Sequence, residues 1–406
     1  MTQMGSQEPG TPQSYRLQKP AVAAIKPSVA AQKRLQCLVT LGAWLGRLFL
    51  KLYVQQVIVV GKEHLQQGPA VVMMNHSNVL DPLILAFHLE RPIHFMVTEP
   101  FMADRFTARV FAWLGQIPKR KLDFDTRSIR TMKQWCQLGG IVGVFPEGHF
   151  SWDGYPLPLQ PGLEQLVSYL DVPVVTVRLI NGDRFWPPWA KNRRKTTLRL
   201  EIDPPKYFKP GEHVEDYVSS HIAVNPETCP RWPAFGKNLT AGLSRLLRFC
   251  PACGADQVLI ESGDALLCKH PSCLSHWNLT SDNQLHEQKQ GTSLSTAQAL
   301  AAVYSHVKQQ WLGLEPYFYS LGTVDVLDCT HAQWTQLDCG FLELQQGFLR
   351  VGKWHLPVHE VLAQTLDWGE LIVLRTRRQR IALRMPVDSR ALWTFVINEA
   401  NNASNG

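Results

Sequence analysis

The stretch from Pro69 to Pro82 constrains the fold most, because an apolar run ends there in groups able to do chemistry. Val71–Met74 is a short, continuous apolar run, which is typical of a fully buried strand. Pro82 suits the first position of a helix, and Asp81 just before it can cap that helix. The pattern therefore predicts a strand, a turn and a helix, with His76 in the turn.

His76 and Asp81 are five residues apart, and on a regular helix such side chains point away from each other. They can meet in an irregular turn, which Pro82 favours because it disfavours helical geometry at Asp81. A carboxylate bonded to one imidazole nitrogen makes the other nitrogen a stronger base. On this interpretation His76 is a general base oriented by Asp81. The alternative for an isolated motif of this kind is an ordinary turn histidine and a simple helix cap.

Three further stretches follow along the chain: LGQIPKR at 114–120, VFPEGHFS at 144–151 and VPVVTV at 172–177. With N-H-x4-D at 75–81, they resemble the four blocks of the glycerolipid acyltransferase family, the 1-acyl-glycerol-3-phosphate (lysophosphatidate) acyltransferases. Those blocks are N-H-x4-D, G-x-I-x-x-x-R, F-P-E-G-T-R-S and V-P-[IV]-x-P-V. The resemblance covers roughly residues 35–210, and four blocks in family order are far more specific than any one block.

The resemblance implies transfer of a fatty acyl group from acyl-CoA or an acyl-carrier protein to the free hydroxyl of 1-acyl-sn-glycerol-3-phosphate, which makes phosphatidate. His76 would be the catalytic base and Asp81 its partner. The family's second-block arginine contacts the acceptor phosphate, which implies a substrate-binding role for Arg120 and its neighbour Lys119. Glu147 and Gly148 match residues of the family's acceptor site, where Glu147 is also expected to orient the hydroxyl. The resemblance implies no metal in the chemistry.

The third block departs from the family pattern, because His149-Phe150-Ser151 replaces Thr-Arg-Ser. The cation expected at position 150 is missing. Either phosphate binding rests more on Arg120 and its neighbours, or the acceptor is another lysophospholipid or a lyso-aminolipid. A third interpretation is a non-catalytic membrane adaptor, although His76, Asp81, Glu147 and Gly148 are all present. The alternative to phosphate binding by the Lys119–Lys121 run is that these charges are simply solvated at the surface.

Alternating strands and helices predict an α/β fold, a central mixed or parallel sheet flanked by helices, as in the glycerol-phosphate acyltransferases that the chain resembles. We place this acyltransferase domain, with an amphipathic N-terminal helix, at residues 33–210. Residues 1–32 are polar and lack an apolar signal segment, so we expect a disordered leader and a chain that stays in the cytoplasm.

The N-terminal helix has leucines at helical spacing, and its uncharged run, Leu35–Gly46, has twelve residues. A bilayer-spanning helix needs about 20. We therefore expect a helix in the membrane interface, at the cytoplasmic face of a membrane, which makes the protein peripheral or monotopic. The alternative is an ordinary core-facing helix.

Beyond a connector at 211–245, four thiols predict a zinc-ribbon-like unit at 246–280. They form C-x2-C, fourteen intervening residues and C-x4-C, at Cys250, Cys253, Cys268 and Cys273. Four ligands close a zinc site, so the metal would be structural. His270 and His276 are substitute ligands.

Residues 281–335 are expected to be a linker and a helix, and 336–400 a β-rich module ending in a helix, a pattern that resembles pleckstrin-homology domains. The ribbon and the net charge of +7 also suit a metal-dependent nucleic-acid-binding protein. The sequence contains no nucleic-acid-binding signature, so we expect no nucleic-acid partner.

Overall fold

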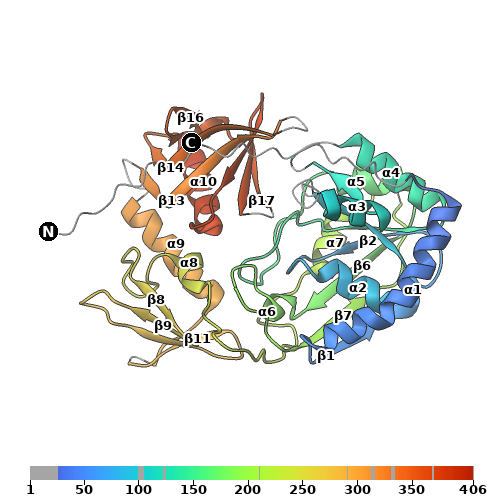
Figure 1. Ribbon diagram of the computed structural model, residues 1–406, viewed down its shortest axis with the longest axis horizontal. Helices are drawn as coiled ribbons and strands as arrows, with labels where there is room; N and C mark the ends of the chain where they lie inside the picture. Colours follow the sequence, from blue (N-terminus) through green and yellow to red (C-terminus); the bar gives the residue numbers. More distant parts are fainter. Residues whose placement is uncertain are drawn as a thin grey trace.

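The computed structural model describes residues 26–98, 105–120, 122, 125–209, 211–289, 291–311, 316–330, 334–367 and 370–405. Most of the leader predicted at 1–32, and Lys121 of the basic run, lie outside the described residues. The N-terminal and C-terminal halves lie side by side (Figure 1).

A seven-stranded mixed sheet forms the centre of the N-terminal half, in the order β1-β7-β6-β2-β5-β3-β4. The strands are β1 (Gln56–Val60), β2 (Ala70–Met74), β3 (Ile93–Thr98), β4 (Ile117–Lys119), β5 (Ile141–Val144), β6 (Val174–Ile180) and β7 (Thr197–Ile202). β6, β2, β5, β3 and β4 run parallel, whereas β7 is antiparallel to β6. The predicted α/β class is confirmed, and the carboxyl ends of the five parallel strands share one edge.

Strand β2 is buried on both faces, which explains its unbroken apolar run. Its alternate side chains enter two separate cores: Val72 and Met74 one, Val71 and Met73 the other. Helix α2 (Asp81–Leu89) and the end of α1 (Val29–Lys51) pack in the first core, while α4 (Thr126–Gln137) and α5 (Leu163–Leu170) pack in the second. Two further helices of this half are α3 (Arg105–Trp113) and α6 (Gly182–Phe185).

Helix α7 (Val214–Ile222) also belongs to this half. Its apolar residues Val214, Val218 and Ile222 are buried in the second core with α4 and α5. Part of the segment that we expected to be a connector at 211–245 therefore belongs to the core of the N-terminal half. Its polar flanks hide this in the sequence, because only a three-residue apolar face points inward.

Helix α1 lies along α2 through small residues (Figure 1). A Cβ at Gly46 would come within 2.6 Å of the Phe87 ring, so only glycine permits this approach. The opposite side of α1 exposes large apolar side chains: Leu41, Trp44, Leu45, Leu48, Phe49 and Leu52. Within the described residues, every helix is too short or too polar to span a bilayer. One side of α1 is thus core-facing, and the other is the apolar face on which the membrane prediction depends.

The C-terminal half contains two antiparallel sheets. A five-stranded sheet has the order β12-β11-β10-β9-β8, and a seven-stranded sheet the order β16-β15-β14-β13-β19-β18-β17. The first comprises β8 (Leu259–Ser262), β9 (Ala265–Cys268), β10 (His276–Leu279), β11 (Gln284–Glu287) and β12 (Ser293–Ser295). The second comprises β13 (Tyr317–Asp328), β14 (Thr335–Gln345), β15 (Phe348–Val351), β16 (Trp354–Pro357), β17 (Ala363–Asp367), β18 (Leu371–Arg375) and β19 (Arg380–Arg384). The helices are α8 (Leu243–Leu247), α9 (Thr296–Trp311) and α10 (Arg390–Asn405).

Both sheets share one hydrophobic core, to which Trp277 of β10, Val303 of α9, Phe318 of β13 and Trp393 of α10 all contribute. The β-rich module ending in a helix is confirmed. The linker expected within 281–335 is not what the structure shows, because β11 and β12 complete the five-stranded sheet and β13 begins the larger one. Strands β11 and β12 are short, and a single apolar residue stands among polar ones in each, so the alternation that would mark them as strands is weak in the sequence.

Candidate active site

The turn after β2 brings His76 and Asp81 together. Asp81 has no exposed surface, and its Oδ2 accepts hydrogen bonds from His76 Nδ1 (3.0 Å), Ser77 N (2.6 Å) and Asn78 N (2.9 Å). The turn therefore wraps around one carboxylate oxygen, which is the irregular geometry that the sequence required. Because a carboxylate only accepts, Nδ1 carries the proton, and the lone pair of the neutral ring is on Nε2.

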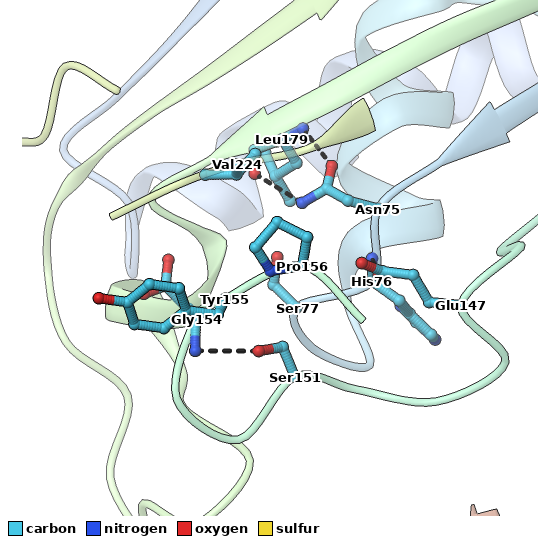
Figure 2. A pocket seen from close by; sticks show the side chains of 11 residues that line it. Asn75, His76, Ser77, Glu147, Ser151, Gly154, Tyr155, Pro156, Leu179 and Val224 are labelled. Atoms are coloured by element: carbon cyan, nitrogen blue, oxygen red, sulfur yellow. Dashed lines mark hydrogen bonds between the residues drawn. The ribbon is translucent and has the colours of Figure 1, made fainter. Parts of the chain in front are cut away.

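Two asparagines that our sequence analysis did not single out fix this turn to β6 and to the start of α6. Asn75 donates to the Leu179 carbonyl (3.1 Å) and accepts from the Leu179 N–H (2.7 Å), as Figure 2 shows. Asn78 donates to the Gly182 carbonyl at 3.1 Å. The asparagine of N-H-x4-D was the available indication, but its partner lies 104 positions away.

Glu147 follows β5 and is only 3% exposed. Its Oε2 accepts from the His76 N–H (2.8 Å) and its Oε1 from the Leu157 N–H (3.0 Å). Burial raises the pKa of Glu147 from its ordinary 4.5 to about 7, although both N–H donors favour the carboxylate. Glu147 thus ties the His76 backbone to the loop that follows β5. Its contact with a substrate hydroxyl stays a prediction.

Gly148 has φ +77°, and a Cβ there would lie 2.9 Å from the Gln160 side chain. Glycine is therefore needed to turn the chain directly after Glu147. The backbone turn alone therefore accounts for a glycine at position 148. The role of Gly148 in substrate binding stays a prediction.

The His76 ring lies between two phenyl rings. Phe145 stacks on it with centroids 3.7 Å apart, and Phe150 is tilted against it at 4.3 Å. The residue that replaces the family's arginine thus contacts the proposed base.

A small cavity of about 20 Å³ adjoins His76, Glu147, Ser151, Tyr155 and Asp183 (Figure 2). It has room for one water molecule or one hydroxyl group.

Lys119 and Arg120 end the edge strand β4, at the same sheet edge as His76. β5 and β3 separate β4 from β2, so three strand spacings place the two sites roughly 14 Å apart at the backbone. Neither cation is among the residues that line the cavity. The structure therefore brings them to the predicted edge but not into contact with the His76–Asp81 pair.

The four predicted thiols converge at one end of the five-stranded sheet. Their Sγ atoms all lie within 4.8 Å of one another, and the Cys250–Cys273 and Cys253–Cys268 pairs are 3.9 Å apart. Four Zn–S bonds of about 2.3 Å in a tetrahedron require Sγ separations of about 3.8 Å. The donor set therefore fits a zinc ion, and this cluster includes neither predicted substitute, His270 or His276.

Residues 56–180 match the family model described as Acyltransferase. Among solved structures, the chain is similar to the 1-acyl-sn-glycerophosphate (LPA) acyltransferase PlsC from Thermotoga maritima, with 23% identity, 48% of this chain and 79% of that chain covered, and a TM-score of 0.38. No curated protein matches the chain. The matched residues include all four motifs in full. Residues 56–180 thus form an acyltransferase domain.

Proposed function

We propose that this protein moves a fatty acyl group from acyl-CoA or an acyl-carrier protein to the free hydroxyl of 1-acyl-sn-glycerol-3-phosphate, making phosphatidate. The observation that carries the proposal is the buried Asp81 carboxylate on His76 Nδ1, within the acyltransferase domain. This contact orients the ring and stabilises the imidazolium that forms when His76 takes a proton.

In the proposed reaction, His76 Nε2 removes the proton from the acceptor hydroxyl as its oxygen attacks the thioester carbonyl carbon. The tetrahedral intermediate collapses with cleavage of the C–S bond, and the imidazolium returns the proton to the leaving thiolate. Atoms balance without an acyl-enzyme. The nearest hydroxyl in the third motif, Ser151 Oγ, is engaged within its own loop with Asp153 and the Gly154 N–H.

Arg120 and Lys119 bind the acceptor phosphate in this proposal. They are supported by their place at the sheet edge, where an arginine offers a planar fork to phosphate oxygens. A second candidate is an acyltransferase for another lysophospholipid or a lyso-aminolipid. The observation in its favour is Phe150, whose ring lies against His76 where the family has a cation.

We also propose that the enzyme works as a peripheral or monotopic protein at the cytoplasmic face of a membrane. The apolar face of α1 continues onto α3, because Arg34 of α1 donates to the Trp113 carbonyl and lies over its ring. Trp113 and Phe106 of α3 are 47% and 75% exposed. Such a face suits the boundary between head groups and acyl chains.

The test measures transfer from labelled acyl-CoA by the purified protein in detergent, with lysophosphatidate and lysophosphatidylethanolamine as acceptors. We expect phosphatidate from the wild type, a loss of about 10²–10⁴-fold in His76→Ala, and little change in the control His221→Ala, whose ring stacks on Tyr217 of α7. Arg120→Gln should raise KM for lysophosphatidate alone. Preference for the ethanolamine lipid would favour the second candidate. Equal turnover by His76→Ala would refute the mechanism, and absence of product with every donor and acceptor would favour the adaptor.

A further inference from the structure

The loop from Ser151 to Leu157 forms one side of the cavity and is bonded directly to the catalytic turn. Ser151, Gly154, Tyr155 and Pro156 line the cavity. The Ser151 N–H donates to the His76 carbonyl at 3.2 Å, and the Leu157 N–H donates to Glu147. A shift of this loop would therefore change both the cavity and the backbone of the base.

Trp152 of the same loop packs in the opposite direction, against the core of the C-terminal half. The Arg390 guanidinium, at the start of α10, lies 5.2 Å from the centre of its ring. Tyr304 of α9 lies close to the next residue of the loop, Asp153. Burial raises the pKa of Tyr304, and the negative charge of Asp153 raises it further. The catalytic loop is thus held between the active site and the C-terminal half.

A second contact joins the C-terminal half to the other end of the site. Leu122, two residues after Arg120, packs against the cluster formed by β13, β18 and β19. Arg375 at the end of β18 donates to the Leu122 carbonyl at 3.0 Å. Arg380 across the same hairpin is 5% exposed and donates to the Cys329 carbonyl. Both arginines thus donate to backbone carbonyls of this chain.

We infer that Trp152 is a positioning residue, through which the C-terminal half (residues 236–405) fixes the catalytic loop against His76. The inference rests on the proposed function and gives that half a role in catalysis. A tryptophan contributes a large rigid contact area, and a cation over its ring adds direction to the packing. Because catalysis is sensitive to displacements of about 1 Å, loosening this contact should affect turnover more than substrate binding.

The experiment compares full-length Trp152→Ala with Trp311→Ala. Trp311 packs on the same core and has a buried indole N–H without a partner, as Trp152 does, but it makes edge-to-face contacts with Phe249, Phe318 and Tyr319. We expect Trp152→Ala to lower kcat by roughly 10–100-fold with KM within about threefold, and Trp311→Ala to leave kcat nearly unchanged. Trp152→Phe should recover most of the loss. Arg390→Gln, which keeps the ring packed, should lower kcat by a smaller factor.

Amide hydrogen exchange separates this inference from the proposed function. Residues 151–157 should exchange at least tenfold faster in Trp152→Ala than in Trp311→Ala, whether or not the right substrates are in hand. Unchanged exchange, or equal kcat losses in the two variants, overturns the positioning role. If Trp152→Ala does not fold, the positioning role is tested by measuring kcat and the amide exchange of residues 151–157 in Arg390→Gln and Trp152→Phe. An inactive wild type whose loop exchanges faster in the variant retains the inference and discards the proposed reaction.

Discussion

Replacing Asp81 with asparagine tests the proposed base most sharply, because it removes a charge and almost no volume. Asp81 Oδ2 accepts three hydrogen bonds and is fully buried. Bonds to a charged group contribute about 1 kcal/mol more than neutral ones, so the weakened bonds cost about 3 kcal/mol. Relief from burying a charge offsets part of this. We expect the free energy of unfolding to fall by about 1–3 kcal/mol.

The effect on catalysis should be larger. An asparagine cannot stabilise the imidazolium, and an amide N–H₂ turned toward Nδ1 would favour the wrong tautomer. We expect kcat to fall by about 10²–10⁴-fold, which corresponds to an activation free energy higher by about 3–5 kcal/mol. The KM for acyl-CoA and the KM for the acceptor should change little. Steady-state assays with labelled acyl-CoA give the rates, and urea denaturation gives the stability.

Asp338→Asn is the control, because this remote carboxylate also accepts three hydrogen bonds, all of them from backbone N–H groups, those of Cys339, Lys353 and Trp354. It should lose stability but keep kcat. The double variant His76→Ala/Asp81→Asn should be no slower than His76→Ala, since residues that act as a unit are not additive. The proposal that His76 and Asp81 act together would be refuted by a kcat within threefold of wild type in Asp81→Asn. It would also be refuted if the losses of kcat in the two single variants added up in the double variant.

Three further outcomes follow from the structure. Folding takes up a proton on Glu147 between pH 4.5 and 7, so wild-type stability should fall by about 2–3 kcal/mol more than that of Glu147→Gln as pH rises from 5 to 8; parallel stability curves would contradict the raised pKa. With a chelator, the free energy of unfolding of the wild type should be about 3 kcal/mol lower than with free zinc at about 100 times its Kd. The stability of Cys268→Ser should not respond to zinc. A wild type whose stability does not respond either would argue against a metal site. Leu45→Glu on the exposed face of α1 should weaken binding to anionic vesicles about ten- to hundredfold, and the similarly exposed control Leu362→Glu should not; equal binding by both would remove α1 from the membrane contact.

The catalytic turn was predictable because its determinants are local. An apolar run, a proline after the carboxylate and a five-residue spacing specify a strand, an irregular turn and a helix, and the structure has all three. The clustering of the four thiols was predictable for a similar reason, since two short Cys pairs bring most of the candidate ligands together.

What the sequence could not give depends on contacts between distant segments. The partner of Asn75 is on β6, that of Trp152 on α10, and that of Leu122 on β18. Each of these residues is unremarkable in its own local pattern. Strand β13 was missed because Tyr317–Asp328 contains a glycine and a β-bulge that break its alternation.

Phe150 changes the electrostatics of the site as well as its ligands. A guanidinium at 4.3 Å from the His76 ring would oppose the imidazolium, whereas the phenyl rings of Phe150 and Phe145 carry no charge and cover part of the ring, whose side chain is 16% exposed. In such surroundings the attraction between His76 and Asp81 is stronger than in water. In the proposed reaction the base would then depend on Asp81, and an anionic head group would depend on the cations at the end of β4. An acceptor held in this way would present its hydroxyl to His76 and its charge to Arg120, three strand spacings along the same sheet edge.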